Sequence, residues 1–233
     1  MTLVKYLSAL GYGTRREVTA LMATQRVTTS DGGAVRDGDP WLHAALRVNG
    51  AALDPAPGAV LMLHKPIGYV CSTNDVPPLI YELLPERFQR RRPVMASIGR
   101  LDRDTSGLLL LTDDGALNHR LTSPRSHVSK TYCARLATPL RGDEAVTFAS
   151  GALTLSGETT PLAPARMLVI NETTAELTLT EGRYHQVRRM FAAAGNHVIA
   201  LHRTAVGAIT LGDLPPAAWR TLTDAEQVSL SAR

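Results

Sequence analysis

Two carboxylates and two arginines stand directly before a run of four leucines in the stretch GRLDRDTSGLLLLTDDG, residues 99–115. Asp102 and Asp104 lie between Gly99 and Gly107, which allow the chain to turn sharply. A carboxylate held in such a loop can act as a nucleophile or as a general base, provided that it is ionised. The pair of acids would also suit a metal ion, and a plain hairpin loop with Asp side chains bonded to its backbone is the simplest alternative. This stretch alone leaves these possibilities open.

Arginine supplies nearly all of the positive charge in this chain of 233 residues. Its lysines are Lys5, Lys65 and Lys130, so 22 of the 25 basic residues are arginines, and the formal net charge is +4. Guanidinium groups bind phosphates and nucleobase edges well, and the composition therefore suits a polyanionic partner without requiring one. The two cysteines form no CxxC pair, and no HExxH motif or Cys/His ladder occurs, so we expect no metal site.

The start of the chain does not have the pattern of a signal peptide, because charged residues 15–17 precede any long apolar run. No stretch approaches the roughly 20 apolar residues that are needed to span a membrane. We therefore expect a cytoplasmic protein without a membrane partner.

Residues 1–57 are predicted to form a small α/β domain. Apolar residues recur at helical spacing in LVKYLSALG (3–11) and TRREVTALMATQRV (14–27), where Thr14 and Glu17 match a capping box. Short extended pieces follow at 26–29 and 45–48. DPAPGA at 54–59 has the composition of a linker, which places the start of a second domain at residue 58.

Residues 58–233 alternate strand-like and helix-like segments. VLMLHKPIGYVCS (60–72) indicates two extended runs about a Lys-Pro-x-Gly bend, and the four leucines indicate a buried strand. A short helix follows, which Asp113 and Asp114 are expected to cap, and YHQVRRMFAAAG (184–195) predicts a further helix. Strands interrupted by helices, with hairpins among them, predict an α+β domain with a mixed sheet.

Four segments in this second domain resemble one enzyme family when taken in order: GRLDRDTSGL (99–108), KTY (130–132), EGRYHQVRRMFAAAGNHV (181–198) and LHRTAVG (201–207). Together they closely resemble the motifs of the RsuA-like pseudouridine synthases, which modify small-subunit ribosomal RNA. The resemblance also includes LHKPIGYVCST and DDGALNHRLTSPR, and so covers residues 61–222. It implies a catalytic domain of pseudouridine synthase type with a mixed, largely antiparallel sheet.

The resemblance also implies roles for individual residues. Asp102 matches the catalytic aspartate, and Arg188 matches the basic residue that pairs with it. Tyr132 matches the tyrosine that stacks on the target uracil, and Leu201 matches the apolar residue beneath the site. The residues expected to contact RNA or to support the structure around the site are Arg100, Lys130, Arg183 and Arg203. Isomerising uridine needs no redox step and no activated donor, so no cofactor is expected.

Several neighbouring residues have simpler interpretations. Asp104 is interpreted as structural, and His185 as a residue that orients others by hydrogen bonds. Arg189 competes with Arg188 for the pairing role, because the two are adjacent.

The first domain resembles the small S-four-type RNA-binding domain that precedes these synthases. Its opening, TLVKYL, has Val4 where the family has an acidic residue. Lys5, Arg15 and Arg16 are the residues of this domain that we expect to contact RNA.

The leading hypothesis is a monomeric enzyme that converts one uridine of small-subunit (16S-type) ribosomal RNA, free or in an assembling particle, to pseudouridine. One alternative within this class is a large-subunit ribosomal RNA target. A second alternative is a non-catalytic RNA-binding factor for ribosome assembly. A third is a metal-dependent nuclease or phosphoesterase that uses Asp102 and Asp104, which would cleave the RNA chain rather than preserve its length.

Overall fold

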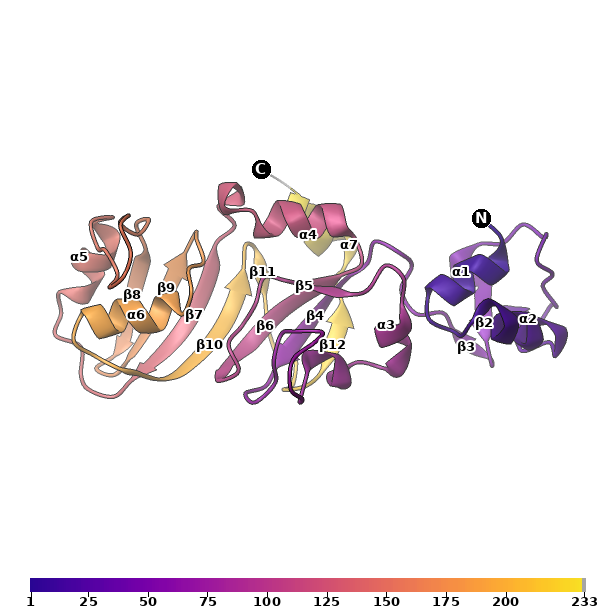
Figure 1. The fold of residues 1–233 in the computed structure, drawn as a ribbon, viewed down its shortest axis with the longest axis horizontal. Helices are drawn as coiled ribbons and strands as arrows, with labels where there is room; N and C mark the ends of the chain where they lie inside the picture. The colour runs from indigo at the N-terminus through magenta and orange to yellow at the C-terminus, as the bar shows by residue number, and fades with distance from the viewer. Residues whose placement is uncertain (232–233) are drawn as a thin grey trace.

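A computed structural model describes residues 1–231 of the chain as an elongated molecule (Figure 1). The N-terminal elements form one end, and a long twisted sheet with its helices forms the rest. No helix among the described residues is both long and apolar enough to cross a membrane.

The N-terminal elements of the described chain are two short helices and a small antiparallel sheet. The helices are α1 (Leu3–Ala9) and α2 (Arg15–Ala23), and the strands are β1 (Val27–Thr29), β2 (Leu46–Val48), with the 3-10 helix η1 (His43–Ala45) before it, and β3 (Ala51–Ala52). The predicted capping box of α2 is confirmed, since Thr14 N donates to Glu17 Oε2 at 2.7 Å and Glu17 N donates to Thr14 Oγ1 at 3.3 Å. Leu7, Val18 and Leu46 are buried between the helices and the sheet.

A buried ion pair anchors the Pro/Gly segment that follows these elements. Arg91 Nε lies 2.6 Å from Asp113 Oδ2, and both side chains are 1% exposed. Arg91 Nη2 also donates to Pro55 O at 2.7 Å, and Gly58 N donates to Asp113 Oδ1 at 2.8 Å. The prediction that Asp113 caps a helix is therefore wrong. Its carboxylate is taken up by a guanidinium, because a buried charge requires a partner.

The large sheet has nine strands within the described residues, in the order β12-β4-β6-β10-β7-β9-β8, with β5 paired to β6 and β11 paired to β10. Among the strand pairs of residues 1–231, only β6 and β10 run parallel, which confirms the predicted mixed, largely antiparallel sheet. The strands are β4 (Val60–Lys65), β5 (Ala96–Ile98), β6 (Thr105–Thr112), β7 (Lys130–Leu136), β8 (Arg166–Asn171), β9 (Thr174–Leu179), β10 (Val198–Val206), β11 (Ile209–Thr210) and β12 (Trp219–Thr221).

Helical segments cover both faces of β6, which is why its leucines are continuous rather than alternating. Leu108 and Leu110 pack in a cluster with side chains of α4 and α7, and Leu109 and Leu111 pack with side chains of η2 and α3. All four are at most 1% exposed, so the predicted buried strand is confirmed. The helices are η2 (Ile80–Leu83), α3 (Glu86–Arg90), α4 (Gly115–Thr122), η3 (Pro124–Ser126), α5 (Glu144–Ala149), α6 (Gln186–Ala193) and α7 (Asp224–Ser231).

Of the two aspartates that were predicted to cap α4, Asp114 does so. Asp114 Oδ1 accepts hydrogen bonds from Ala116 N at 2.9 Å and from Leu117 N at 3.0 Å, which satisfies two amides that lack helical partners.

Gly107 marks the place where β6 and β10 lie closest together. Its φ is +112°, and a Cβ at this position would lie 2.2 Å from Arg203 O, so no other residue fits. Its register partners are Lys65 on β4 and Arg203 on β10. Register partners point to the same face of a sheet, so two basic side chains flank a position without a side chain. Both are buried, with exposed fractions of 0% and 2%.

Candidate active site

A cleft of about 410 Å³ lies where β6, β7 and β10 meet the segments that precede β6 and α6. Most of the residues that the motifs single out line it, namely Asp102, Tyr132, Leu201, Arg100, Lys130, Arg183 and Arg203. Lys5, Arg15 and Arg16 are exposed on α1 and α2, at the far end of the molecule (Figure 1). The sequence motifs therefore converge on one cavity, with the N-terminal basic residues outside it.

A buried lysine, Lys65, holds the loop that carries Asp102. Lys65 Nζ donates to Asp102 O at 3.0 Å, to Thr105 O at 2.8 Å and to Pro66 O at 3.1 Å. Burial lowers the pKa of Lys65, and the nearby carboxylate of Asp102 opposes that shift. The lysine therefore binds the ends of a turn rather than a single carboxylate.

The Lys-Pro-x-Gly bend interlocks with this turn through its backbone. Gly68 N donates to Arg103 O at 2.7 Å, and Arg103 Nε donates back to Gly68 O at 3.1 Å. Thr105 N closes the turn by donating to Asp102 O at 3.1 Å. Sequence reasoning identified the bend but gave Lys65 no role. The available signal was a lysine at the end of the apolar strand VLMLHK, where only a partnered charge can be buried.

The carboxylate of Asp102 has His185 as its neighbour, with His185 Nε2 at 3.3 Å from Asp102 Oδ1. The expected pair between Arg188 and Asp102 is not formed in the described part of the chain. Arg188 Nη2 instead lies 2.7 Å from Asp104 Oδ2, and Arg188 Nη1 donates to Val198 O at 2.9 Å. Arg188 thus ties the loop of Asp102 and Asp104 to α6 and β10. Asp104 contacts Arg188 and is structural, as expected from the sequence.

Tyr132 has a buried cation beside its ring. Arg203 Cζ lies 6.0 Å from the centre of the Tyr132 ring, and Arg203 Nε donates to Leu108 O at 2.7 Å. Because Arg203 is buried, it supports the ring and β6 rather than reaching for a phosphate. Lys130 Nζ donates to Val128 O at 2.9 Å, and burial is the main cause of the lowered pKa of Lys130. Leu201 is buried in the floor of the cleft.

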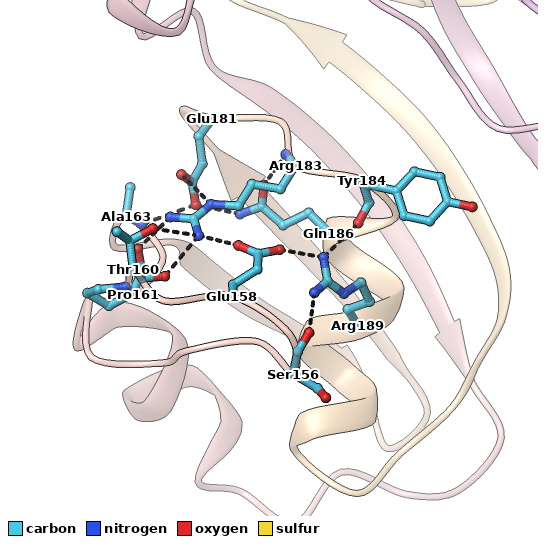
Figure 2. Close-up of polar contacts among 10 residues, drawn as sticks. All are labelled: Ser156, Glu158, Thr160, Pro161, Ala163, Glu181, Arg183, Tyr184, Gln186 and Arg189. Carbon is cyan, nitrogen blue, oxygen red and sulfur yellow. Dashed lines mark hydrogen bonds and ion pairs between the residues drawn. The ribbon is translucent and has the colours of Figure 1, made fainter.

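Arg183 is also committed to protein partners (Figure 2). Its Nη1 contacts the carboxylate of Glu158 and donates to Thr160 O at 2.9 Å, while Nη2 donates to Pro161 O. Its Nε lies 3.3 Å from Glu181 Oε2. Of the two roles expected for Arg183, an RNA contact or structural support, these contacts favour structural support. The partners come from a loop some distance away in sequence, which the local motif does not reveal.

No group of three or more His, Cys, Asp or Glu side chains in residues 1–231 is placed to hold a metal ion. The cleft instead combines an acid, a tyrosine ring and an apolar floor in a shell of cations. Such a site can hold a planar, polar ring next to a carboxylate.

Comparison with known proteins gives a consistent result. The family model described as RNA pseudouridylate synthase matches residues 59–193. Ribosomal small subunit pseudouridine synthase A of Escherichia coli (strain K12) is 49% identical over 171 residues, which are 72% of this chain and 72% of that protein. The protein of the same name from Yersinia pestis is 44% identical over 237 residues, 100% of this chain and 99% of its own. A crystal structure of a pseudouridylate synthase superposes with a TM-score of 0.69 and 36% identity, over 99% of both chains.

Proposed function

The chain belongs to the RNA pseudouridylate synthase family, and we propose that it converts one uridine of small-subunit ribosomal RNA to pseudouridine. The observation that carries the reaction is the position of Asp102 in the cleft that Tyr132 also lines, with His185 Nε2 3.3 Å from its carboxylate. The small-subunit target is supported by the names of the relatives, which match this chain over 72% to 100% of its length.

Asp102 is the group that we propose to act on the ribose. Its carboxylate either attacks the anomeric carbon or removes a ribose proton to give a glycal, and in both routes the C1′–N1 bond breaks. The base then turns and its C5 bonds to C1′, which displaces the Asp102 carboxylate in the first route and is accompanied by return of the ribose proton in the second. The C5 proton leaves and N1 takes up a proton, so that the product has the mass of the substrate. The ammonium group of Lys65 holds the turn that presents this carboxylate, since it donates to Asp102 O and Thr105 O.

Tyr132 is proposed to hold the uracil by stacking. A uridine in folded RNA must leave its helix to enter a cleft of this kind, and it loses the stacking energy of its neighbours. An aromatic ring replaces part of that energy, and the guanidinium of Arg203 limits the motion of the ring from its other side. Leu201 excludes water beneath the base.

Residues 1–57 are proposed to act as a separate RNA-binding domain. Lys5, Arg15 and Arg16 are exposed on its helices and meet the requirement for phosphate contacts. These contacts would bind the RNA away from the cleft. The distance between the N-terminal domain and the cleft would then determine which uridine reaches Asp102.

We expect Asp102→Asn to abolish the reaction while it preserves the fold, because the amide keeps the size of the carboxylate and loses its negative charge. The measurement is tritium release from ribosomal RNA labelled at uridine C5. Small-subunit RNA and partly assembled small-subunit particles are the two substrates, each with and without EDTA.

Asp104→Asn is the matched control, since it removes a neighbouring carboxylate that contacts Arg188 outside the cleft. It should retain at least about a tenth of the activity, a loss typical of altered positioning. Equal loss in both variants, with sensitivity to EDTA or with cleaved RNA, would favour the metal-dependent alternative. Tritium release from large-subunit RNA alone would contradict the proposed target, and no release from either RNA would contradict the proposed enzyme.

Tyr132→Ala should lower kcat/KM by roughly 5- to 150-fold, the range that corresponds to removal of one base-stacking interaction of about 1–3 kcal/mol. Tyr132→Phe keeps the ring and should retain most of the activity. The two variants are compared by initial rates of tritium release. An equal loss in both would show that the hydroxyl group, rather than stacking, is the essential feature.

Reversing the charge of Arg15 and Arg16 to Glu should weaken RNA binding and flatten its dependence on salt, by about 0.7–0.9 in the logarithmic slope for each phosphate that the protein no longer neutralises. Arg166→Glu is the matched control, because it is exposed on β8 at the opposite end of the molecule (Figure 1). Filter binding over a range of salt concentrations measures both. A salt slope equal to that of the wild type would show that these arginines do not contact phosphates.

A further inference from the structure

Tyr184 is a large aromatic side chain at the cleft that the proposed reaction does not use. It lines the cleft and is nevertheless 74% exposed. Its ring stacks on the ring of His185, with 3.8 Å between the ring centres and 18° between the planes. Since His185 covers one face of the tyrosine and so much of the residue is exposed, the other face is open to solvent.

The stacked pair leads directly to the reacting group. His185 Nε2 lies 3.3 Å from Asp102 Oδ1, so the imidazole lies between Tyr184 and the carboxylate. The open face of Tyr184 is therefore one ring further from the reaction centre than His185. A nucleotide beside the target uridine is joined to it by a single phosphodiester linkage, so it stays close to the cleft when the target base is flipped into it.

The backbone of Tyr184 is held in place by an ion-pair network (Figure 2). Arg189 Nη1 donates to Tyr184 O at 3.2 Å and lies 2.5 Å from Glu158 Oε1. Arg189 Nη2 donates to Ser156 O at 2.8 Å. Figure 2 shows the ring of Tyr184 pointing away from this network, so the contacts fix the residue without occupying its ring.

Side-chain contacts fix the rest of the segment as well. Arg183 N donates to Gln186 Oε1 at 2.8 Å, and Gln186 Nε2 donates to Glu181 Oε1 at 2.7 Å. His185 has a φ of +49°, in the left-handed region, directly before α6, and its ring stacks on that of Tyr184. A ring fixed before binding loses little conformational entropy when a ligand stacks on it.

We propose that the open face of Tyr184 is a stacking platform for the nucleobase next to the target uridine. The inference rests on the proposed function, since it requires an RNA substrate whose target base has left the helix. Flipping that base deprives its neighbour of a stacking partner, and an exposed aromatic ring supplies one. Every base has a π-face, so Tyr184 adds affinity at this position without selecting a base.

The test compares wild type, Tyr184→Phe and Tyr184→Leu, with Val228→Ala on the exposed side of α7 as a surface control. KM and kcat come from tritium release with C5-labelled small-subunit RNA. Kd for the same RNA comes from filter binding in the Asp102→Asn background, in which the RNA is not turned over. Tyr184→Leu should raise KM and Kd by about 5- to 150-fold with kcat within about threefold of wild type, as expected for one stacking interaction. Tyr184→Phe should match the wild type.

Each other outcome overturns the inference. An unchanged KM and Kd in Tyr184→Leu, with active wild type, would show that no base stacks there. A fall in kcat at constant KM would show that Tyr184 acts through His185 on Asp102 and is a positioning residue. Loss in Tyr184→Phe equal to that in Tyr184→Leu would assign the effect to the hydroxyl group. Inactivity of the wild type on every RNA would instead reject the proposed function, which keeps the two failures distinct.

Discussion

The position of Asp102 depends on a charged group that never meets solvent. Lys65 extends from the end of β4 and donates to the backbone oxygens of Asp102 and Thr105, which close a single turn. Beside it, Gly107 allows β10 to approach β6 so closely that Arg203 lies in the same row. Burying an ammonium group without hydrogen-bond acceptors would strongly destabilise the folded state. The turn supplies these acceptors to Lys65, and Lys65 holds the turn in place. The loop of Asp102 is thus placed by backbone contacts, and these contacts do not use its carboxylate, whose neighbour is His185.

The arginines around the cleft also position the site through contacts with other parts of the protein. Arg188 fastens the Asp102 turn to α6 through Asp104, and Arg203 supports Tyr132 from the neighbouring strand. Arg183 and Arg189 share Glu158 and fix the segment before α6. In this protein Arg183, Arg188 and Arg203 thus build the site, and the exposed Arg100 and the N-terminal basic residues are the ones that we propose to contact the RNA. A basic motif near an RNA-binding cleft is not by itself a set of phosphate contacts.

The sequence predicted the α+β fold with its mixed sheet, the buried leucine strand, the capping box of α2 and the convergence of Asp102, Tyr132 and Leu201 on one cleft. These features depend on local pattern or on motif order. The partners of the charged residues could not be predicted. Adjacent positions on a helix point about 100° apart, so Arg188 and Arg189 reach different acids, and Glu158 comes from a loop outside every motif. Lys65 was given no role because its partners are backbone oxygens far away in sequence. Asp113 was wrongly assigned as a helix cap because its partner is the side chain of Arg91, 22 residues earlier.

The most direct test of this account is amide hydrogen exchange in Lys65→Met, which keeps the length of the side chain and removes its charge. The amides of Thr105 and Gly68 report on the turn, since they donate to Asp102 O and Arg103 O. The account predicts that both exchange at least about tenfold faster than in wild type while the amides of β9 keep their protection, as expected for local loosening, and that kcat falls with them. A folded Lys65→Met protein with wild-type exchange at both amides and wild-type kcat would contradict it.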